Sequence, residues 1–329
     1  MPLCRDLADS TVVITGASGG IGAATAERLA SRGATVVLAA RRPGALKTVA
    51  ERCAALGGRT LVVPTDVTDA GAVTDLAAEA AGTFGRLDAW INNAGVALYA
   101  PLHEAPLTDV LRVLDINLMG TLHGARAAVP HLRAGGGGVL VNISSVLGVV
   151  SAPHLGMYNV TKHAILGLSD TLRQDLRVQG DRSVSVCTVL PASIDTPFYR
   201  HAGNRTGRTP RPLPPVYPPE LVADTIMRVL ERPRRQAYAG PLGRVLAAQW
   251  RLLPGLTERV LTWYGDRAAL SSEPTEVSEG NLFTPSEQPA TTDGGYHGRR
   301  RTMARTAAGT GIATAAAVAA IALARRGQH

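Results

Sequence analysis

Short runs rich in β-branched residues alternate with longer stretches of alanine and leucine along the first 240 residues. The short runs have the length of strands, and the longer stretches have the 3.6-residue period of helices. Strands that alternate with helices pair in parallel, because a parallel pair needs a crossover connection. We therefore expect an α/β domain with a doubly wound parallel sheet of seven strands. The expected strands are residues 11–15, 35–40, 60–64, 87–91, 139–143, 183–189 and 236–239.

A glycine-rich turn, Thr15-Gly16-Ala17-Ser18-Gly19-Gly20-Ile21-Gly22, directly follows the first expected strand. Backbone N–H groups at such a strand-to-helix turn, and the positive end of the helix, bind the pyrophosphate of a dinucleotide. A glycine-rich turn also occurs in α/β proteins that bind no dinucleotide. Interpreted as a cofactor site, the turn assigns phosphate binding to Gly16, Ser18, Gly19, Gly20, Ile21 and Gly22.

The same turn also fits the pattern G-x-S-x-G, which exposes the nucleophile of a serine hydrolase. In those hydrolases several strands and an oxyanion loop precede the nucleophile, whereas Ser18 follows the first strand of this chain. A hydrolase that uses Ser18 is therefore the less favoured alternative.

Cofactor choice is expected at the end of the second strand, which reads Ala39-Ala40-Arg41-Arg42. An acidic residue there would hold the ribose 2′-hydroxyl of NAD. This chain has no carboxylate at that point, and two guanidinium groups can bind a phosphate. Arg41 and Arg42 therefore favour NADP(H), although two solvated arginines at a helix start are the simpler alternative.

Tyr158 and Lys162 lie four residues apart, which brings them onto one face of an expected helix. Polar residues end two neighbouring strands, in Asn92-Asn93-Ala94-Gly95 and Asn142-Ile143-Ser144-Ser145. Ligands of open α/β sheets bind at these carboxyl ends. A free tyrosine has a pKa of about 10, but a nearby cation favours the phenolate, so Tyr158 can exchange a proton with a substrate.

These motifs resemble, in order, those of the short-chain dehydrogenase/reductase family over residues 7–240: TGASGGIG, Asp66-Val67, NNAG, Asn117, ISS, YxxxK and the run from Leu190 to Pro197. The resemblance implies a Rossmann fold and an oxidoreductase that transfers a hydride between NADP(H) and a carbonyl or alcohol. It implies Tyr158 as general acid and base, and Ser145, 13 residues earlier, as the group that polarises the substrate oxygen. Lys162 would hold the nicotinamide ribose, and Asn117 would support a proton-relaying water. Further cofactor contacts implied by the resemblance are Asp66 and Val67 at the adenine, then Asn93, Ala94, Gly95, Tyr158, Pro191, Ile194 and Thr196.

One departure from the family pattern is Pro191-Ala192, where the family usually has Pro-Gly. The extra methyl group lies near the nicotinamide, but it removes no catalytic group. A member that binds NADP(H) as a sensor or scaffold, without turnover, is the alternative from another functional class. Intact Ser145, Tyr158 and Lys162 argue against it.

The Arg- and Pro-rich loop over residues 200–219 is expected to close over the substrate. Its four arginines either meet an anionic substrate or, as we favour, lie in water. Mostly apolar residues flank the expected site and favour a lipophilic ketone, aldehyde or secondary alcohol: Leu98, Leu147, Val149, Val150, His154, Leu155, Phe198 and Tyr199. The family resemblance also implies a homodimer or homotetramer.

Composition divides the chain into three parts. Residues 1–270 form the expected catalytic domain, which ends in amphipathic helices that carry Trp250 and Trp263. Residues 271–305 form a Pro-, Ser- and Glu-rich, then basic, linker without fixed structure. Residues 306–324 form an uncharged, alanine-rich helix. Its length can just span a bilayer core of roughly 30 Å. Because alanine contributes little transfer energy, a spanning helix, a surface-lying helix and an exposed tail all stay open.

The net charge of +8 is concentrated at the C-terminus, where six arginines and no acid follow Asp293. Residues 1–293 together then carry a net charge of +2, and no nucleic-acid partner is expected. Three scattered cysteines suit a reducing compartment, and no His/Cys pair has the spacing of metal ligands. Without a recognisable signal peptide, we expect a cytoplasmic protein, either free or attached to the cytoplasmic face of a membrane by its C-terminal segment.

Overall fold

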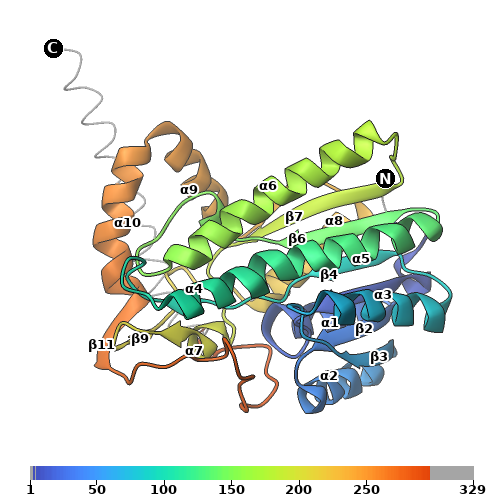
Figure 1. The fold of residues 1–329 in the computed structure, drawn as a ribbon, viewed down its shortest axis with the longest axis horizontal. Coiled ribbons are helices and arrows are strands. Elements are labelled where there is room, and N and C mark those ends of the chain that lie inside the picture. The colour runs from blue at the N-terminus through green and yellow to red at the C-terminus, as the bar shows by residue number, and fades with distance from the viewer. Residues whose placement is uncertain (1–2, 4, 297–329) are drawn as a thin grey trace.

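A seven-stranded parallel sheet forms the centre of the computed structural model, which describes residue 3 and residues 5–296 (Figure 1). The sheet confirms the predicted doubly wound Rossmann class, and each strand begins and ends within two residues of its expected bounds. Strand order reverses between β1 and β4, and ligands bind at such a switch point. From edge to edge the strands are β10 (Gln236–Ala239), β7 (Val184–Pro191), β6 (Gly138–Ile143), β4 (Ala89–Asn92), β1 (Thr11–Thr15), β2 (Thr35–Ala40) and β3 (Arg59–Pro64).

Helices cover both faces of the sheet, and each face has its own hydrophobic core. One core packs the sheet against α1 (Gly20–Ala30), α2 (Pro43–Ala55) and α8 (Pro219–Glu231). The other packs it against α3 (Ala70–Phe84), α4 (Leu107–Leu114), α5 (Gly120–Ala134) and α6 (Gly156–Val178). Because both faces are covered, the central strands β1, β4 and β6 are buried along their whole length rather than at alternate residues.

A chain of buried hydrogen bonds ties the carboxyl ends of β4 and β6 to α6. Trp90 Nε1 donates to Asn92 Oδ1 over 2.7 Å, and Asn92 Nδ2 donates to Asn142 Oδ1 over 2.9 Å. Asn142 Nδ2 in turn donates to Ser169 Oγ over 2.9 Å. Buried amides that are fully paired hold one arrangement of the surrounding elements. This series of hydrogen bonds therefore positions α6, which carries Tyr158 and Lys162, relative to the sheet.

The C-terminal part has the helices expected before residue 270 and departs from the sequence-based expectation after it. A helical hairpin, α9 (Pro241–Leu252) and α10 (Pro254–Ala269), leads into β11 (Leu270–Pro274), which pairs with β9 (Arg208–Pro210). We expected no fixed structure from residue 271, but residues 271–296 return to the catalytic body, where Leu282 is fully buried. The order comes from arginines of the body that bind backbone carbonyls of this segment, an interaction that needs no apolar pattern.

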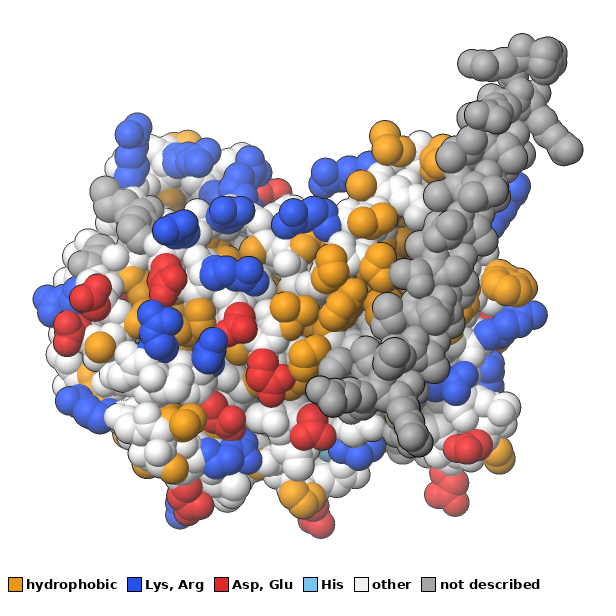
Figure 2. Space-filling view, turned by 180° about the vertical axis from the view of Figure 1, so that it is seen from behind, with side chains coloured by type: hydrophobic (Ala, Val, Ile, Leu, Met, Phe, Trp, Pro, Cys, Tyr) orange, Lys and Arg blue, Asp and Glu red, His pale blue; other side chains and the backbone are white. Residues whose placement is uncertain are grey.

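The predicted apolar helix, residues 306–324, lies outside the described residues. Within the described part, no helix has the length and apolarity to cross a membrane. Side chains of both charges are spread over the face of the molecule seen in Figure 2.

Replacing Gly124 in α5 by alanine should lower the free energy of unfolding by about 1–3 kcal/mol, as overpacking does in a core. A Cβ there would overlap Asn92 Oδ1 and lie 2.7 Å from Trp90 Nε1. Urea unfolding followed by tryptophan fluorescence measures the loss. In the control Gly167→Ala, nothing lies within 4 Å of the new methyl group, so stability should stay equal or rise. Equal stability of the two variants would contradict the close packing of α5.

Candidate active site

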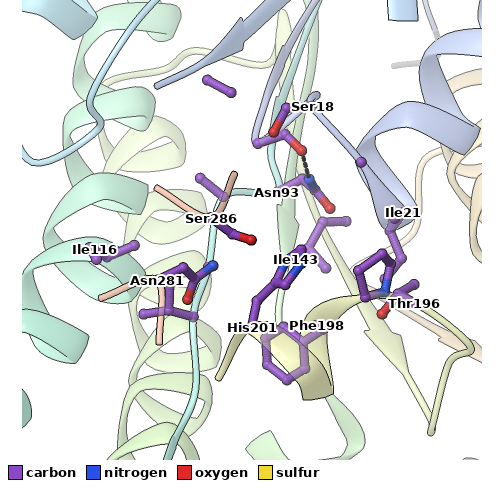
Figure 3. A pocket seen from close by; sticks show the side chains of 18 of the residues that line it. Ser18, Ile21, Asn93, Ile116, Ile143, Thr196, Phe198, His201, Asn281 and Ser286 are labelled. Carbon is purple, nitrogen blue, oxygen red and sulfur yellow. Dashed lines mark hydrogen bonds between the residues drawn. The ribbon is translucent and has the colours of Figure 1, made fainter. Parts of the chain in front are cut away.

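A cavity of about 250 Å³ lies at the carboxyl edge of the sheet, at the switch point between β1 and β4 (Figure 3). Its walls come from the glycine turn, the ends of β2, β4, β6 and β7, helix α6, and the C-terminal segment. All cofactor residues expected from the sequence line it except Gly22. The lining residues expected from the sequence are Gly16, Ser18, Gly19, Gly20, Ile21, Arg41, Arg42, Asp66, Val67, Asn93, Ala94, Gly95, Tyr158, Lys162, Pro191, Ile194 and Thr196.

The glycine turn is held tightly against the loop after β4. Asn93 Nδ2 donates to the carbonyls of Thr15 and Gly16 over 3.0 and 3.1 Å. Thr15 Oγ1 accepts the N–H groups of Asn93 and Ala94. Gly16 has a φ of 67°, and a Cβ at Gly22 would overlap the carbonyl oxygen of Gly16. Gly22 therefore shapes the turn from behind, although it does not line the cavity.

Arg41 and Arg42 line the cavity and also bind the C-terminal segment. Arg41 donates to the carbonyls of Asn281 and Phe283 over 2.7 and 3.0 Å, and Arg42 donates to that of Ser286 over 2.6 Å. The sequence singled out both arginines but not these partners. Asn281, Pro285, Ser286, Pro289 and Thr291 are additional lining residues from this segment, which we had interpreted as a linker because its composition is polar.

The four expected catalytic side chains are all buried or lie in the cavity. Ser145, Asn117 and Lys162 are buried, and Tyr158 lines the cavity with Ser145 and Lys162. Lys162 Nζ lies 5.5 Å from the centre of the Tyr158 ring and donates to the carbonyl of Ile143 over 2.9 Å. The two neighbouring serines differ: Ser144 Oγ donates to the backbone carbonyl of Lys162, whereas Ser145 hydrogen bonds with Tyr158.

Burial governs the electrostatics of this pair. Burial raises the pKa of Tyr158 to about 12, and the hydrogen bond with Ser145 opposes part of that shift. Burial also lowers the pKa of Lys162 to about 8. From the sequence we expected the lysine cation, together with an oxidised nicotinamide, to favour the phenolate. In the protein alone the loss of hydration is the larger effect, and Tyr158 keeps its proton at neutral pH.

Asn117 lies in a π-helical turn, Asp115–Met119, between α4 and α5. Its Oδ1 accepts the Val96 N–H over 2.8 Å, and its Nδ2 donates to the Val96 carbonyl and to Thr161 Oγ1. A Cβ at Gly95 would lie 3.3 Å from Asn117 Oδ1 and 3.6 Å from Lys162 Nζ. Gly95 therefore keeps open a small space that both polar groups border.

Ala192, the departure from the family pattern, fits because neighbouring glycines make room. A Cβ at Gly240 would lie 2.9 Å from the Ala192 methyl carbon. The Ala192 backbone N–H still donates to the carbonyl of Ala239 over 2.9 Å. The loop is thus held in place by β10 with the methyl group accommodated.

Three of the four loop arginines are bound to other parts of the protein, in contrast to our expectation of solvated charges. Arg205 pairs with buried Asp109, and Arg208 pairs with Asp266. Arg211 donates to the carbonyls of Arg267 and Ala268, while Arg200 is exposed. These pairs attach the loop to α4 and α10. Phe198 and Tyr199 line the cavity, and the Phe198 ring lies 5.6 Å from that of Tyr158.

The hydrolase alternative finds no support at Ser18. His201, the histidine that lines the same cavity, forms a hydrogen bond with Gln288 Oε1 over 3.1 Å. A serine nucleophile needs a histidine within hydrogen-bonding reach.

Comparisons with known proteins identify the family of this chain. The model of the family described as short chain dehydrogenase matches residues 10–206, so the chain belongs to this family of oxidoreductases. The uncharacterized oxidoreductase YxnA of Bacillus subtilis is 35% identical over 281 residues, which cover 83% of this chain and 78% of that protein.

Two solved structures share the fold. A short-chain dehydrogenase/reductase from Burkholderia phymatum, in complex with NAD, is 30% identical with a TM-score of 0.68, over 75% of this chain and 96% of that one. The alcohol dehydrogenase of Thermococcus sibiricus, complexed with 5-hydroxy-NADP, is 25% identical with a TM-score of 0.60, over 70% and 94%. The chain is therefore an oxidoreductase with the fold of nicotinamide-binding enzymes.

The stability of the cofactor-free protein should rise between pH 8 and pH 9. Lys162 releases its proton near pH 8 in the fold, against a pKa of 10.5 for an ordinary lysine. The unfolded state then binds more protons, so the free energy of unfolding rises by up to about 1.4 kcal/mol per pH unit. Cys53 and Cys187 act in the opposite direction above pH 9, because burial raises the pKa of each thiol from 9.0 to about 11 and the unfolded thiols lose their protons first. Tyr158 does the same above pH 10.

Urea unfolding at a series of pH values measures this rise. Lys162→Met should abolish it, whereas Lys47→Met, at an exposed position on α2, should retain it. The same pH dependence in both variants would contradict the burial of the Lys162 ammonium.

Proposed function

We propose that the protein is an NADP(H)-dependent oxidoreductase that interconverts a lipophilic ketone or aldehyde and the corresponding alcohol. The observation that carries this proposal is the presence of Tyr158, Ser145 and Lys162 in one cavity with the glycine turn. Family membership supports hydride transfer but names neither cofactor nor substrate.

The shape of the turn fits a dinucleotide, since its backbone has the close approaches that only glycine allows. N–H groups of Gly19 and Ile21, which line the cavity, would bind the pyrophosphate, and Asp66 and Val67 would contact the adenine. Lys162 would hold the nicotinamide ribose, with Ile194 and Thr196 at the carboxamide. When bound, the nicotinamide donates or accepts the hydride.

Tyr158 is the proton donor to the substrate oxygen in the direction of carbonyl reduction. Its raised pKa supports this role, because a neutral phenol has a proton to give. Ser145 donates a hydrogen bond to the same oxygen and stabilises the negative charge that develops there. Lys162 and Asn117 border the space next to Gly95, where a water would return a proton to the tyrosine.

The surroundings of Tyr158 favour a neutral, lipophilic substrate. Phe198 and Tyr199 pack against Tyr158 in one apolar cluster. Arg205 and Arg208 are neutralised by Asp109 and Asp266. An anionic substrate would have to displace those carboxylates before it could pair with either arginine.

Cofactor preference rests on Arg41 and Arg42. The bonds from Arg42 to the C-terminal segment use Nη1, so its other N–H groups can bind a 2′-phosphate. The NAD complex of the Burkholderia phymatum relative makes NAD the competing candidate.

Tyr158→Phe should lower kcat for NADPH-dependent carbonyl reduction by roughly 10²–10⁴-fold, since it removes the proton donor. Binding of NADPH, followed by fluorescence, should change little. A panel of aliphatic, steroid-like and quinone carbonyls and keto acids supplies the substrates, and Tyr238→Phe, outside the cavity, is the matched control. Wild-type protein that binds NADPH but reduces nothing on the panel would favour the sensor or scaffold.

Arg42→Gln should shift the ratio of the dissociation constants of NADPH and NADH at least tenfold toward NADH, because a charge-assisted bond contributes about 1.5–3 kcal/mol. The two cofactors differ only in the 2′-phosphate, so effects on the parts of the dinucleotide that they share cancel in the ratio. Arg28→Gln, in a surface ion pair with Asp224, should leave the ratio unchanged. A ratio that stays the same in Arg42→Gln would refute the role of this arginine.

A further inference from the structure

The segment formed by residues 281–296, here called the C-terminal strap, crosses the cofactor cavity and is anchored at both ends. At its beginning Leu282 is fully buried, and its carbonyl accepts a hydrogen bond from Arg112 Nε over 3.0 Å. At its end Asp195 Oδ1 accepts the N–H groups of Gly294 and Tyr296 over 2.8 and 2.9 Å. The strap thus joins the adenine side of the cavity to the loop that carries Thr196.

Between these anchors the strap is held by its backbone carbonyls. Arg41 and Arg42 bind carbonyls in the first half, and Arg52 donates to the carbonyl of Ala290 over 2.9 Å. The carbonyl of Thr291 accepts the N–H of Gly20 over 3.0 Å. The strap therefore contacts both the expected 2′-phosphate site and the glycine turn.

The strap also forms one wall of the cavity, as Figure 3 shows for Asn281 and Ser286. Arg41 holds Asn281 in place by donating to its backbone carbonyl, and Arg112 holds Leu282 in the same way. Arg112 also pairs with Asp66. The side-chain oxygen Oδ1 of Asn281 is buried and has no hydrogen-bond partner among the described residues. A buried polar atom without a partner, in a side chain that lines a ligand cavity, suits a ligand that supplies the missing donor once it binds.

We propose that the C-terminal strap is part of the cofactor-binding site. It closes over the adenosine half of the bound dinucleotide, Asn281 accepts a hydrogen bond from the adenosine, and the cofactor is exchanged only when the strap opens. This inference rests on the proposed binding of a nicotinamide dinucleotide, and it adds Asn281 and the strap anchors to the residues that determine how long the cofactor stays bound.

A strap that instead occupied the place of the cofactor would be an inhibitor of binding. Such a competitor would be expected to mimic the phosphates with acidic side chains at the glycine turn. The strap acids Glu287 and Asp293 are exposed. The Thr291 carbonyl, which accepts the Gly20 N–H, would have to give up this bond when a phosphate binds there. The cavity also persists beneath the strap, with Tyr158 and the glycine turn among its walls. Loosening the strap should weaken cofactor binding if the strap covers the bound cofactor. It should strengthen cofactor binding if the strap competes with the cofactor.

Gly294→Ala loosens the strap without touching an arginine. A Cβ at buried Gly294 would overlap the carbonyl oxygen of Thr196 and lie 2.7 Å from its carbon. Stopped-flow fluorescence of NADPH and of NADH measures dissociation from the full-length protein. We expect the dissociation rate to rise at least tenfold, with a higher dissociation constant. The matched control Gly82→Ala, where nothing lies within 4 Å of the new methyl group, should behave as wild type.

Asn281→Ala keeps every backbone anchor of the strap and removes only the side chain that lines the cavity. It therefore tests the proposal even if Gly294→Ala fails to fold. Its dissociation rate should rise several-fold for both cofactors. Unchanged rates in this variant, or tighter binding in Gly294→Ala, would overturn the proposal. These readouts need no turnover: failure of wild-type protein to bind either nucleotide would refute the proposed function itself, whereas normal binding with unaltered release would refute the strap alone.

Discussion

The close contact between the glycine turn and the loop after β4 is the constraint on which the site depends. Thr15 and Asn93 exchange hydrogen bonds across it, and Gly16 and Gly22 leave no room for a side chain. The contact aligns the helix start of α1 with the carboxyl end of β4, and the amide chain through Asn92 extends this alignment to β6 and α6. The phosphate-binding turn and the catalytic tyrosine candidate therefore belong to one continuous hydrogen-bonded framework.

The strands, the glycine turn and the Tyr158 site could be predicted from the sequence, because each depends on a local pattern or a motif. The strap could not, since its order comes from arginines some 240 positions earlier that bind carbonyls, groups that every sequence possesses. Buried Leu282 and the Tyr296 ring, which packs on Tyr199, were the available signals in an otherwise polar stretch. The partners of the loop arginines were hidden for the same reason: Asp109 and Asp266 lie far away in the sequence.

Burial explains why the pKa values of Tyr158 and Lys162 differ from those that the YxxxK spacing alone would suggest. A motif gives spacing, and spacing indicates that a cation lies near a phenol. The structure adds the loss of hydration, which raises the pKa of Tyr158 and lowers that of Lys162. A neutral phenol beside a reduced cofactor is a proton donor, whereas the positive charge of an oxidised nicotinamide would favour the phenolate. The charge of the cofactor can therefore set the protonation state that each direction of the reaction needs.

If Arg41 and Arg42 bind the 2′-phosphate as proposed, they connect cofactor choice to the strap. Each guanidinium has several N–H groups in a fixed plane, so one arginine can bind a carbonyl on one side and a phosphate on the other. A 2′-phosphate bound by Arg42 would hold the arginine in the orientation that also binds the strap. Because coupling between two ligands of one group is reciprocal, a closed strap would in turn orient Arg42 for the phosphate. Selectivity for NADP(H) and closure of the strap would then strengthen each other through a single side chain.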